Sequence, residues 1–148
     1  METDQEKYRG YAEALAEAGI AIGDVPMLQA DSWDAEAAAA LLDWAPGATA
    51  VLSMSVMQGI AVLDEARRRG LPVPGELSVV GFNEIPEASA SIPPLTTIDG
   101  MSRSKGWIAA RMIFEKLAPH NKVIPPRLIV RGSTAPPPPR HGPVASSA

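Results

Sequence analysis

Two polar side chains stand just past two apolar runs of this sequence, where they could hold a small polar ligand. Ser55 follows the run Thr49–Ser53, and Asn83 lies just past the run Leu77–Val80. Short apolar runs of this kind are typical of buried parallel strands, whose carboxyl ends meet at the ligand-binding edge of a sheet. A hydroxyl and an amide can each donate and accept hydrogen bonds there. The alternative is that each residue caps the helix or turn that follows it.

Motifs of catalysis and metal binding are missing from the sequence. There is no G-x-S-x-G elbow, no phosphate-binding glycine loop and no H-E-x-x-H pattern. His120 and His141 are isolated, the chain has no cysteine, and nothing marks Glu84 and Glu87 as a catalytic pair. We therefore expect neither an enzyme nor a metal or cofactor site.

The elements that would position the ligand-binding residues alternate along the chain. A capping box at Thr3 and apolar residues at helical spacing predict a helix that ends at Gly19. Three further helices are expected: Trp33–Trp44 with Asp31 and Ser32 as caps, Val56–Arg69, and Met101–Leu117 with Ile108 and Met112 buried. Strands are expected at Val25–Gln29, Thr49–Ser53, Leu77–Val80, Leu95–Ile98 and Leu128–Val130.

Alternating helices and strands predict an α/β fold, a parallel sheet flanked by helices on both faces with right-handed crossovers. Between the strands that end at Val80 and begin at Leu95, Pro93 and Pro94 force an extended path. The proline-rich tail, residues 136–148, cannot form a core, so we expect it to be disordered or extended. Residues 1–135 are then the single folded domain.

Composition limits the classes of protein and partner. The 148 residues carry a net charge of -4, which argues against a stand-alone nucleic-acid binder. The one basic run, Arg67–Arg69, lies at an expected helix C-terminus, where cations interact favourably with the helix dipole. No apolar stretch approaches the ~20 residues of a membrane span, and the acidic start is unlike a secretory signal, so a cytoplasmic location is expected.

Several stretches resemble the effector-binding domain of LacI/GalR-type transcription regulators. They are K-Y-R-G-Y-A-E-A-L-A-E-A-G-I, A-T-A-V-L-S-M-S, R-R-R-G-L-P-V-P-G-E-L-S-V-V-G-F-N-E-I-P-E-A, I-P-P-L-T-T-I and P-P-R-L-I-V-R-G-S-T-A-P, in that order. The resemblance extends to Pro136 and covers only the C-terminal part of such a regulator. It implies a fold like that of type I periplasmic sugar-binding proteins with an incomplete second subdomain, in which Trp107 and Met112 would be partly exposed.

The same resemblance implies roles for four residues that would bind a sugar effector. Lys7 aligns with the arginine of an R-x-x-G-Y pattern, which clamps the effector, and a solvated Lys7 is the alternative. Asn83 takes the place of an acid that bonds sugar hydroxyls. Ser55 matches a position that commonly carries Asn or Ser, but Val56 replaces the acid that usually follows. Trp33 resembles an aromatic residue that covers the bound sugar.

For the whole protein, the resemblance implies a regulator in which a small carbohydrate changes hinge closure and thereby operator binding. DNA would be bound only through a helix-turn-helix domain absent from this chain. A homodimer is implied, with Ile60 and Ile92 as interface contacts. Two alternatives stay open, a sugar-binding protein for transport and a degenerate fragment without ligand function.

Overall fold

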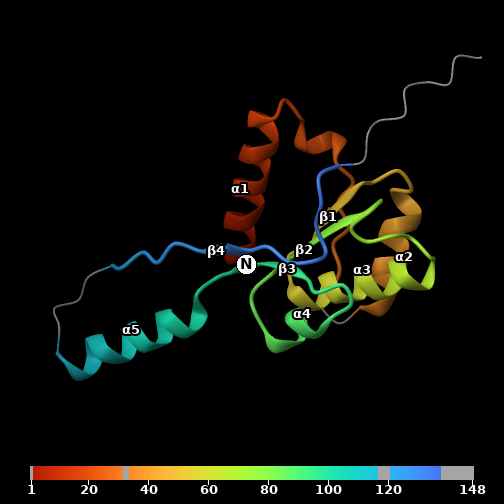
Figure 1. Ribbon diagram of the computed structural model, residues 1–148. Coiled ribbons are helices and arrows are strands. Elements are labelled where there is room, and N and C mark those ends of the chain that lie inside the picture. Colours follow the sequence, from red (N-terminus) through yellow and green to blue (C-terminus); the bar gives the residue numbers. More distant parts are fainter. Residues whose placement is uncertain (1, 32–33, 117–120, 138–148) are drawn as a thin grey trace, which may run out of the picture.

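Residues 2–31, 34–116 and 121–137 are described by the computed structural model of the chain (Figure 1). The helices are α1 (Glu2–Glu17), α2 (Ala35–Trp44), α3 (Val56–Arg68), α4 (Pro86–Ala90) and α5 (Ser102–Phe114), with a 3₁₀ turn η1 (Ile22–Asp24). The strands are β1 (Ala50–Leu52), β2 (Ser78–Phe82), β3 (Thr96–Asp99) and β4 (Arg127–Ile129). The predicted tail lies outside the described residues from position 138 onward.

The four strands form one mixed sheet in the order β1-β2-β3-β4. β1, β2 and β3 are parallel, and β4 runs antiparallel to β3, with Thr97 opposite Ile129. The α/β class and the parallel arrangement of the first three strands are therefore confirmed. Because the parallel strands share one direction, the residues that follow β1 and β2 lie at the same edge.

The core lies between the sheet and α3, and α2 packs against α3 and adds Ala38 and Leu42 to the same core. Gly59 in α3 and Gly81 in β2 allow the close approach of helix and sheet. A Cβ at Gly81 would lie 2.8 Å from Leu95 Cδ2 and 3.3 Å from the Cα of Val56. The fully buried side chains around this contact are mainly aliphatic: Leu63, Leu77, Val79 and Leu95.

The basic run Arg67–Arg69 is used in ion pairs at the end of α3. Arg69 bridges α2 and α3, with Nη1 at 2.7 Å from Asp43 Oδ1 and Nε at 2.5 Å from Glu65 Oε1. Hydrogen bonds from Arg68 and Arg69 lower the pKa of Glu65 to about 2. This arrangement agrees with the structural interpretation of the run.

The segment before α2 differs from the prediction. No strand forms at Val25–Gln29, where the chain is extended after η1 but pairs with no described strand. α1 begins at Glu2, so Thr3 lies inside the helix and not at its N-cap. α2 begins at Ala35 and is capped by Asp34, whose Oδ1 accepts from the amides of Glu36 and Ala37, so Asp31 is not the cap. Ser32 lies outside the described residues.

Two further differences follow β2. The strand continues through Gly81 to Phe82, two residues beyond the predicted end at Val80. The short helix α4, with Pro86 at its first turn, occupies part of what was expected to be a loop. Pro is well suited to the first turn of a helix, because the amide it lacks would have no intrahelical partner there.

α5 projects away from the sheet (Figure 1) and contributes no buried residue to the core. Ile108 and Met112 are only partly buried, so their predicted burial is wrong. Trp107 is 61% exposed and Phe114 is 85% exposed. The expected partial exposure of Trp107 and Met112 is confirmed. Among the described residues, no helix is long and apolar enough to cross a membrane.

The segment after β4 returns to the sheet and links the two strands β2 and β3. The amide of Val79 donates to Ser133 O, and Ser133 Oγ donates to Val79 O at 2.6 Å. The same hydroxyl accepts from the amide of Thr96 at 2.8 Å. Ser133 is fully buried, so one side chain links the core strand β2, the strand β3 and the end of the described chain.

Candidate functional site

Asn83 lies directly after β2 at the carboxyl edge of the sheet. Its φ of 76° is left-handed, a conformation that asparagine tolerates better than most residues. Its amide donates to Ile98 O at 2.9 Å, which ties it to β3 and leaves the side chain exposed. α4 has Ile85 at its N-cap with no side-chain hydrogen bond, so Asn83 does not cap that helix.

Lys7 reaches the same edge from α1. Its Nζ lies 4.4 Å from the centre of the Phe82 ring, a cation–π contact. Phe82 immediately precedes Asn83, so Lys7 contacts the residue before the one that was predicted to bind with it. The neighbouring Arg9 pairs instead with Glu6 within α1, Nη2 to Oε2 at 2.7 Å.

Ser55 follows β1 and caps α3. Its Oγ accepts from the amide of Gln58 at 3.1 Å, so the capping alternative is seen directly. Capping uses an acceptor lone pair of the hydroxyl and leaves its hydrogen for another acceptor. The cap and a hydrogen bond to a ligand are therefore compatible at Ser55.

Trp33 lies outside the described residues, but the chain just before it is fixed. Gln58 Nε2 donates to Ala30 O at 3.0 Å, which holds the end of the extended segment against the first turn of α3. Sequence reasoning missed Gln58. Its position three residues after the cap Ser55 places it in the first helical turn at the same edge, and that spacing was the available signal.

Glu84 forms a partly buried cluster that sequence reasoning assigned to a turn or to solvent. Arg131 Nη2 donates to Glu84 Oε1 at 2.5 Å, and Nη1 donates to Leu95 O at 2.8 Å. Thr97 Oγ1 donates to the other carboxylate oxygen. The Arg131 guanidinium and the Thr97 hydroxyl lower the pKa of Glu84. The cluster holds Glu84, the residue next to Asn83, against β3 and against the segment after β4.

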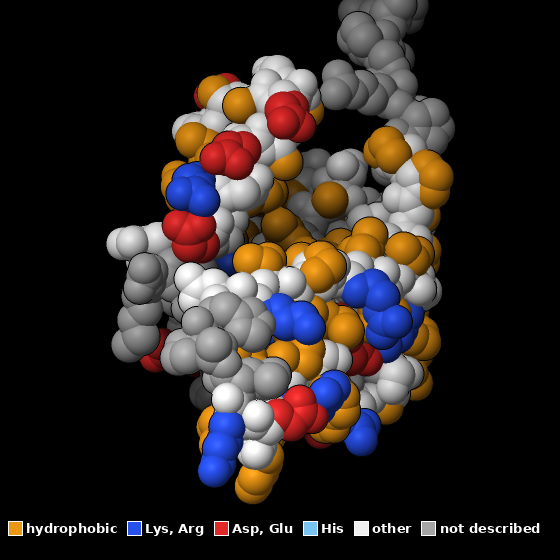
Figure 2. Space-filling view, turned by 90° about the vertical axis from the view of Figure 1, so that its left-hand side faces the viewer, with side chains coloured by type: hydrophobic (Ala, Val, Ile, Leu, Met, Phe, Trp, Pro, Cys, Tyr) orange, Lys and Arg blue, Asp and Glu red, His pale blue; other side chains and the backbone are white. Residues whose placement is uncertain are grey.

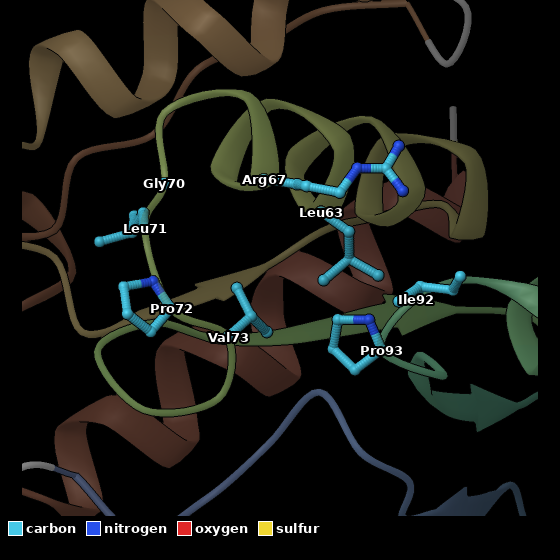
Figure 3. Close-up of a pocket in the computed structure, with 8 residues that line it drawn as sticks. All are labelled: Leu63, Arg67, Gly70, Leu71, Pro72, Val73, Ile92 and Pro93. Carbon is cyan, nitrogen blue, oxygen red and sulfur yellow. The ribbon is translucent and has the colours of Figure 1, made fainter.

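A groove of about 300 Å³ lies away from this edge, between α3, the loop after it and the Ile92–Pro93 loop. Figure 3 shows Leu63, Val73 and Pro93 directed toward one another across it. Ile92 is 72% exposed at its rim. Ile60 lies one turn before Leu63 in α3 and is partly buried against the core. Of the two predicted interface residues, Ile92 lines this largely apolar groove, and Ile60 is not among its lining residues.

The groups at the carboxyl edge include hydrogen-bond donors and acceptors as well as an aromatic ring. An amide, a hydroxyl and an ammonium group come from three different elements, and Phe82 provides an aromatic ring. No group of three or more potential metal ligands occurs within residues 2–31, 34–116 and 121–137. This is the composition of a polar binding site with an apolar wall.

Comparison with known proteins agrees with this geometry. The model of the periplasmic binding protein-like domain matches residues 2–134. HTH-type transcriptional regulator MalR from Streptomyces coelicolor is 40% identical over 99 residues, which cover 64% of this chain and 29% of MalR. A LacI family transcriptional regulator from Mycobacterium smegmatis is 34% identical, with a TM-score of 0.70 over 90% of this chain and 53% of that one.

A complex of transcriptional regulator CelR with cellobiose is 28% identical, with a TM-score of 0.63 over 86% of this chain and 42% of that one. The sequence resemblance to LacI/GalR-type regulators is confirmed by these matches. The chain spans less than half the length of the curated relatives and about half of the solved chains that it matches.

Proposed function

Because the chain belongs to the periplasmic binding protein-like domain family, we propose that it forms the effector-sensing part of a LacI-type transcription regulator. The observation that carries the proposal is the contact between Lys7 Nζ and the Phe82 ring at the end of β2, directly before Asn83. The effector class is a small carbohydrate, in line with the CelR–cellobiose complex among the solved relatives. The site of action is the cytoplasm.

Each predicted residue has a distinct part in sugar binding. The Asn83 amide pairs with two hydroxyl groups, one as donor and one as acceptor, and Lys7 donates to a third. Ser55 donates its remaining hydrogen to a ring substituent. Trp33 covers the apolar face of the sugar, as aromatic residues do through their C–H contacts. The edge supplies one wall of a cleft, and the second subdomain supplies the other.

The readout of binding is a shift between open and closed subdomain arrangements. A helix-turn-helix domain outside these 148 residues then gains or loses affinity for its operator. A homodimer matches the two half-sites of such an operator. We assign its interface to the groove beside α3, where Ile92 is exposed and Ile60 lies on the adjoining stripe of α3.

Sugar binding is tested by thermal melts followed by tryptophan fluorescence with cellobiose and other mono- and disaccharides. A sugar at about 100 times its dissociation constant stabilises the folded chain by ~2.7 kcal/mol. We expect Asn83→Ala to remove most of the rise in melting temperature. Glu87→Gln, an exposed change in α4, is the matched control and should keep it. Equal responses of both variants would contradict the assignment of Asn83.

The interface is tested with the double variant Ile60→Asp, Ile92→Asp. Sedimentation should show a dimer for the parent chain and a monomer for the variant, since two carboxylates would be buried in an apolar contact. Val123→Asp is the control, because Val123 is 90% exposed and lies outside the groove. A double variant as dimeric as the parent would remove this interface from consideration.

A further inference from the structure

The segment between η1 and α2 has little to hold it in place. None of residues 26–30 makes a backbone–backbone hydrogen bond to another described residue, and the segment joins no described strand. Its side chains add little packing, since Met27 and Leu28 are 41% and 43% exposed. The preceding helix α1 gives little support, because a hollow lies between it and the body of the molecule (Figure 2). The position of the segment therefore depends on specific contacts.

Gln58 in the first turn of α3 makes such a contact. Its Nε2 donates to Ala30 O at 3.0 Å, and within the described part of the chain this is the one hydrogen bond that reaches residues 26–30. The bond is partly buried, where a hydrogen bond competes less with water. The backbone amide of Gln58 also donates to the capping hydroxyl of Ser55 at 3.1 Å. One residue therefore ties the segment to the turn that carries Ser55.

The orientation of the Gln58 amide follows from its partner. A carbonyl oxygen only accepts hydrogen bonds, so the NH₂ group of Gln58 faces Ala30 O and the Oε1 atom does not. Oε1 is open to solvent, because no buried side-chain oxygen or nitrogen of the described residues lacks a partner. An ionised glutamate at this position would keep the length of the side chain but could not donate to Ala30 O. The contact thus requires an amide and not only a polar side chain of this size.

We infer that Gln58 is a positioning residue of the sugar site, which holds the segment that leads to Trp33 at a fixed distance from Ser55. The inference rests on the proposed function, in which Ser55 and Trp33 both contact the sugar. Trp33 follows Ala30 by three residues. A segment that is loose before binding must be ordered when the sugar binds, and that cost lowers the affinity. Gln58 removes the cost in advance and acts without touching the sugar itself.

The sugar affinity of two Gln58 variants tests the inference. Titration calorimetry measures the dissociation constants of cellobiose and the other mono- and disaccharides for parent and variants. Gln58→Met keeps the length of the side chain without an amide, and Gln58→Glu keeps an acceptor oxygen without the donor. For a sugar that binds the parent, we expect the dissociation constant to rise about tenfold in both variants. Normal affinity in Gln58→Glu together with a loss in Gln58→Met would show that Oε1 contacts the sugar directly, and would overturn the positioning role.

Ser78→Ala is the matched control for a general loss of stability. Ser78 lies at the start of β2, at the opposite end of the strand from Asn83. Its Oγ donates to Ala135 O at 3.2 Å and accepts from the Ala135 amide at 3.1 Å. We expect Ser78→Ala to lower the melting temperature as Gln58→Met does and to leave the sugar affinity unchanged. An equal loss of affinity in both variants would assign the effect of Gln58 to stability and overturn the inference.

Cleavage by chymotrypsin after Leu28, followed by mass spectrometry, measures the hold on the segment without any sugar. Cleavage should be faster in Gln58→Met and Gln58→Glu than in the parent, and unchanged in Ser78→Ala. Equal rates in all four chains would show that Gln58 does not hold the segment. A parent that binds no sugar would contradict the proposed function, and faster cleavage in the variants would then leave Gln58 with a structural role only.

Discussion

Replacing Glu84 by glutamine, or Arg131 by methionine, removes one partner of the ion pair that fixes the residue next to Asn83. The side chains of Arg131 and Glu84 are 17% and 27% exposed. Arg131 donates to both carboxylate oxygens of Glu84 and to Leu95 O, so its loss leaves several acceptors without a donor.

The expected cost lies between that of a buried and that of a surface pair. Breaking a buried pair costs about 3–5 kcal/mol, and exposed pairs contribute about 0–1 kcal/mol. For this degree of exposure we expect Arg131→Met to lower the free energy of unfolding by about 2 kcal/mol. Glu84→Gln keeps the hydrogen bond with Thr97 and should cost about 1 kcal/mol.

The contribution of Glu84 also depends on pH. Arg131 lowers the pKa of Glu84 in the folded chain below its ordinary value of 4.5. The unfolded chain therefore binds the proton first as the pH falls, so the stabilisation is fully present above the ordinary pKa of 4.5 and is lost progressively as the pH falls through the lowered pKa of the folded chain. The difference in stability between wild type and Glu84→Gln should shrink from pH 7 to pH 3.

Urea denaturation followed by far-UV circular dichroism measures these free energies at each pH, and a double-mutant cycle gives the coupling between the two residues. Glu115→Gln is the control, because the Arg111–Glu115 pair of α5 is half exposed and its loss should not change stability measurably. A coupling energy below about 0.5 kcal/mol, or a difference between wild type and Glu84→Gln that stays constant with pH, would refute the reasoning.

Three further outcomes are expected from unfolding and sedimentation measurements. Ser55→Ala should cost about 1 kcal/mol by removing the cap of α3, and Ser55→Asp should retain most of that stability. Gly81→Ala should cost about 2 kcal/mol because its Cβ would meet Leu95 at 2.8 Å, whereas Gly106→Ala, with nothing within 4 Å, should be neutral or stabilising. Trp107→Lys should reduce concentration-dependent association without lowering stability, since Trp107 is 61% exposed. Unchanged association would show that the apolar side chains of α5 do not mediate it.

The predictable elements were those with signals in their own residues. α3 was placed almost to the residue because Ser55 caps its start and Gly70, with a φ of 68°, follows its end. The strand at Val25–Gln29 was wrong because its residues favour an extended backbone, and no described neighbour pairs with them. The burial of Ile108 and Met112 was wrong for a related reason, since helical periodicity shows which face is apolar but not what covers it.

In the candidate site, too, the residues with a local sequence signal were predicted and those that depend on distant partners were not. Ser55 and Asn83 could be placed at one edge because parallel strands end together, whereas Lys7 was named through the family resemblance and contacts Phe82, the residue before Asn83. Arg131 lies 47 residues from Glu84, so nothing local linked them. Gln58 had only a weak local signal, its position in the first turn of a helix. The signal for α4 was the proline at its start, which is equally typical of a loop.

The tie made by Ser133 sets a delay during synthesis of the chain. Its hydroxyl bonds the carbonyl of Val79, which leaves the ribosome 54 residues earlier. At about 5–20 residues per second, β2 waits roughly 3 to 11 s for the side chain that joins it to β3. During that interval the nascent chain contains α3 and β2 but lacks the hydrogen bond from Ser133 to Val79. The link between β2 and β3 through Ser133 therefore forms late in translation, and truncation before Ser133 would yield a sheet without this link.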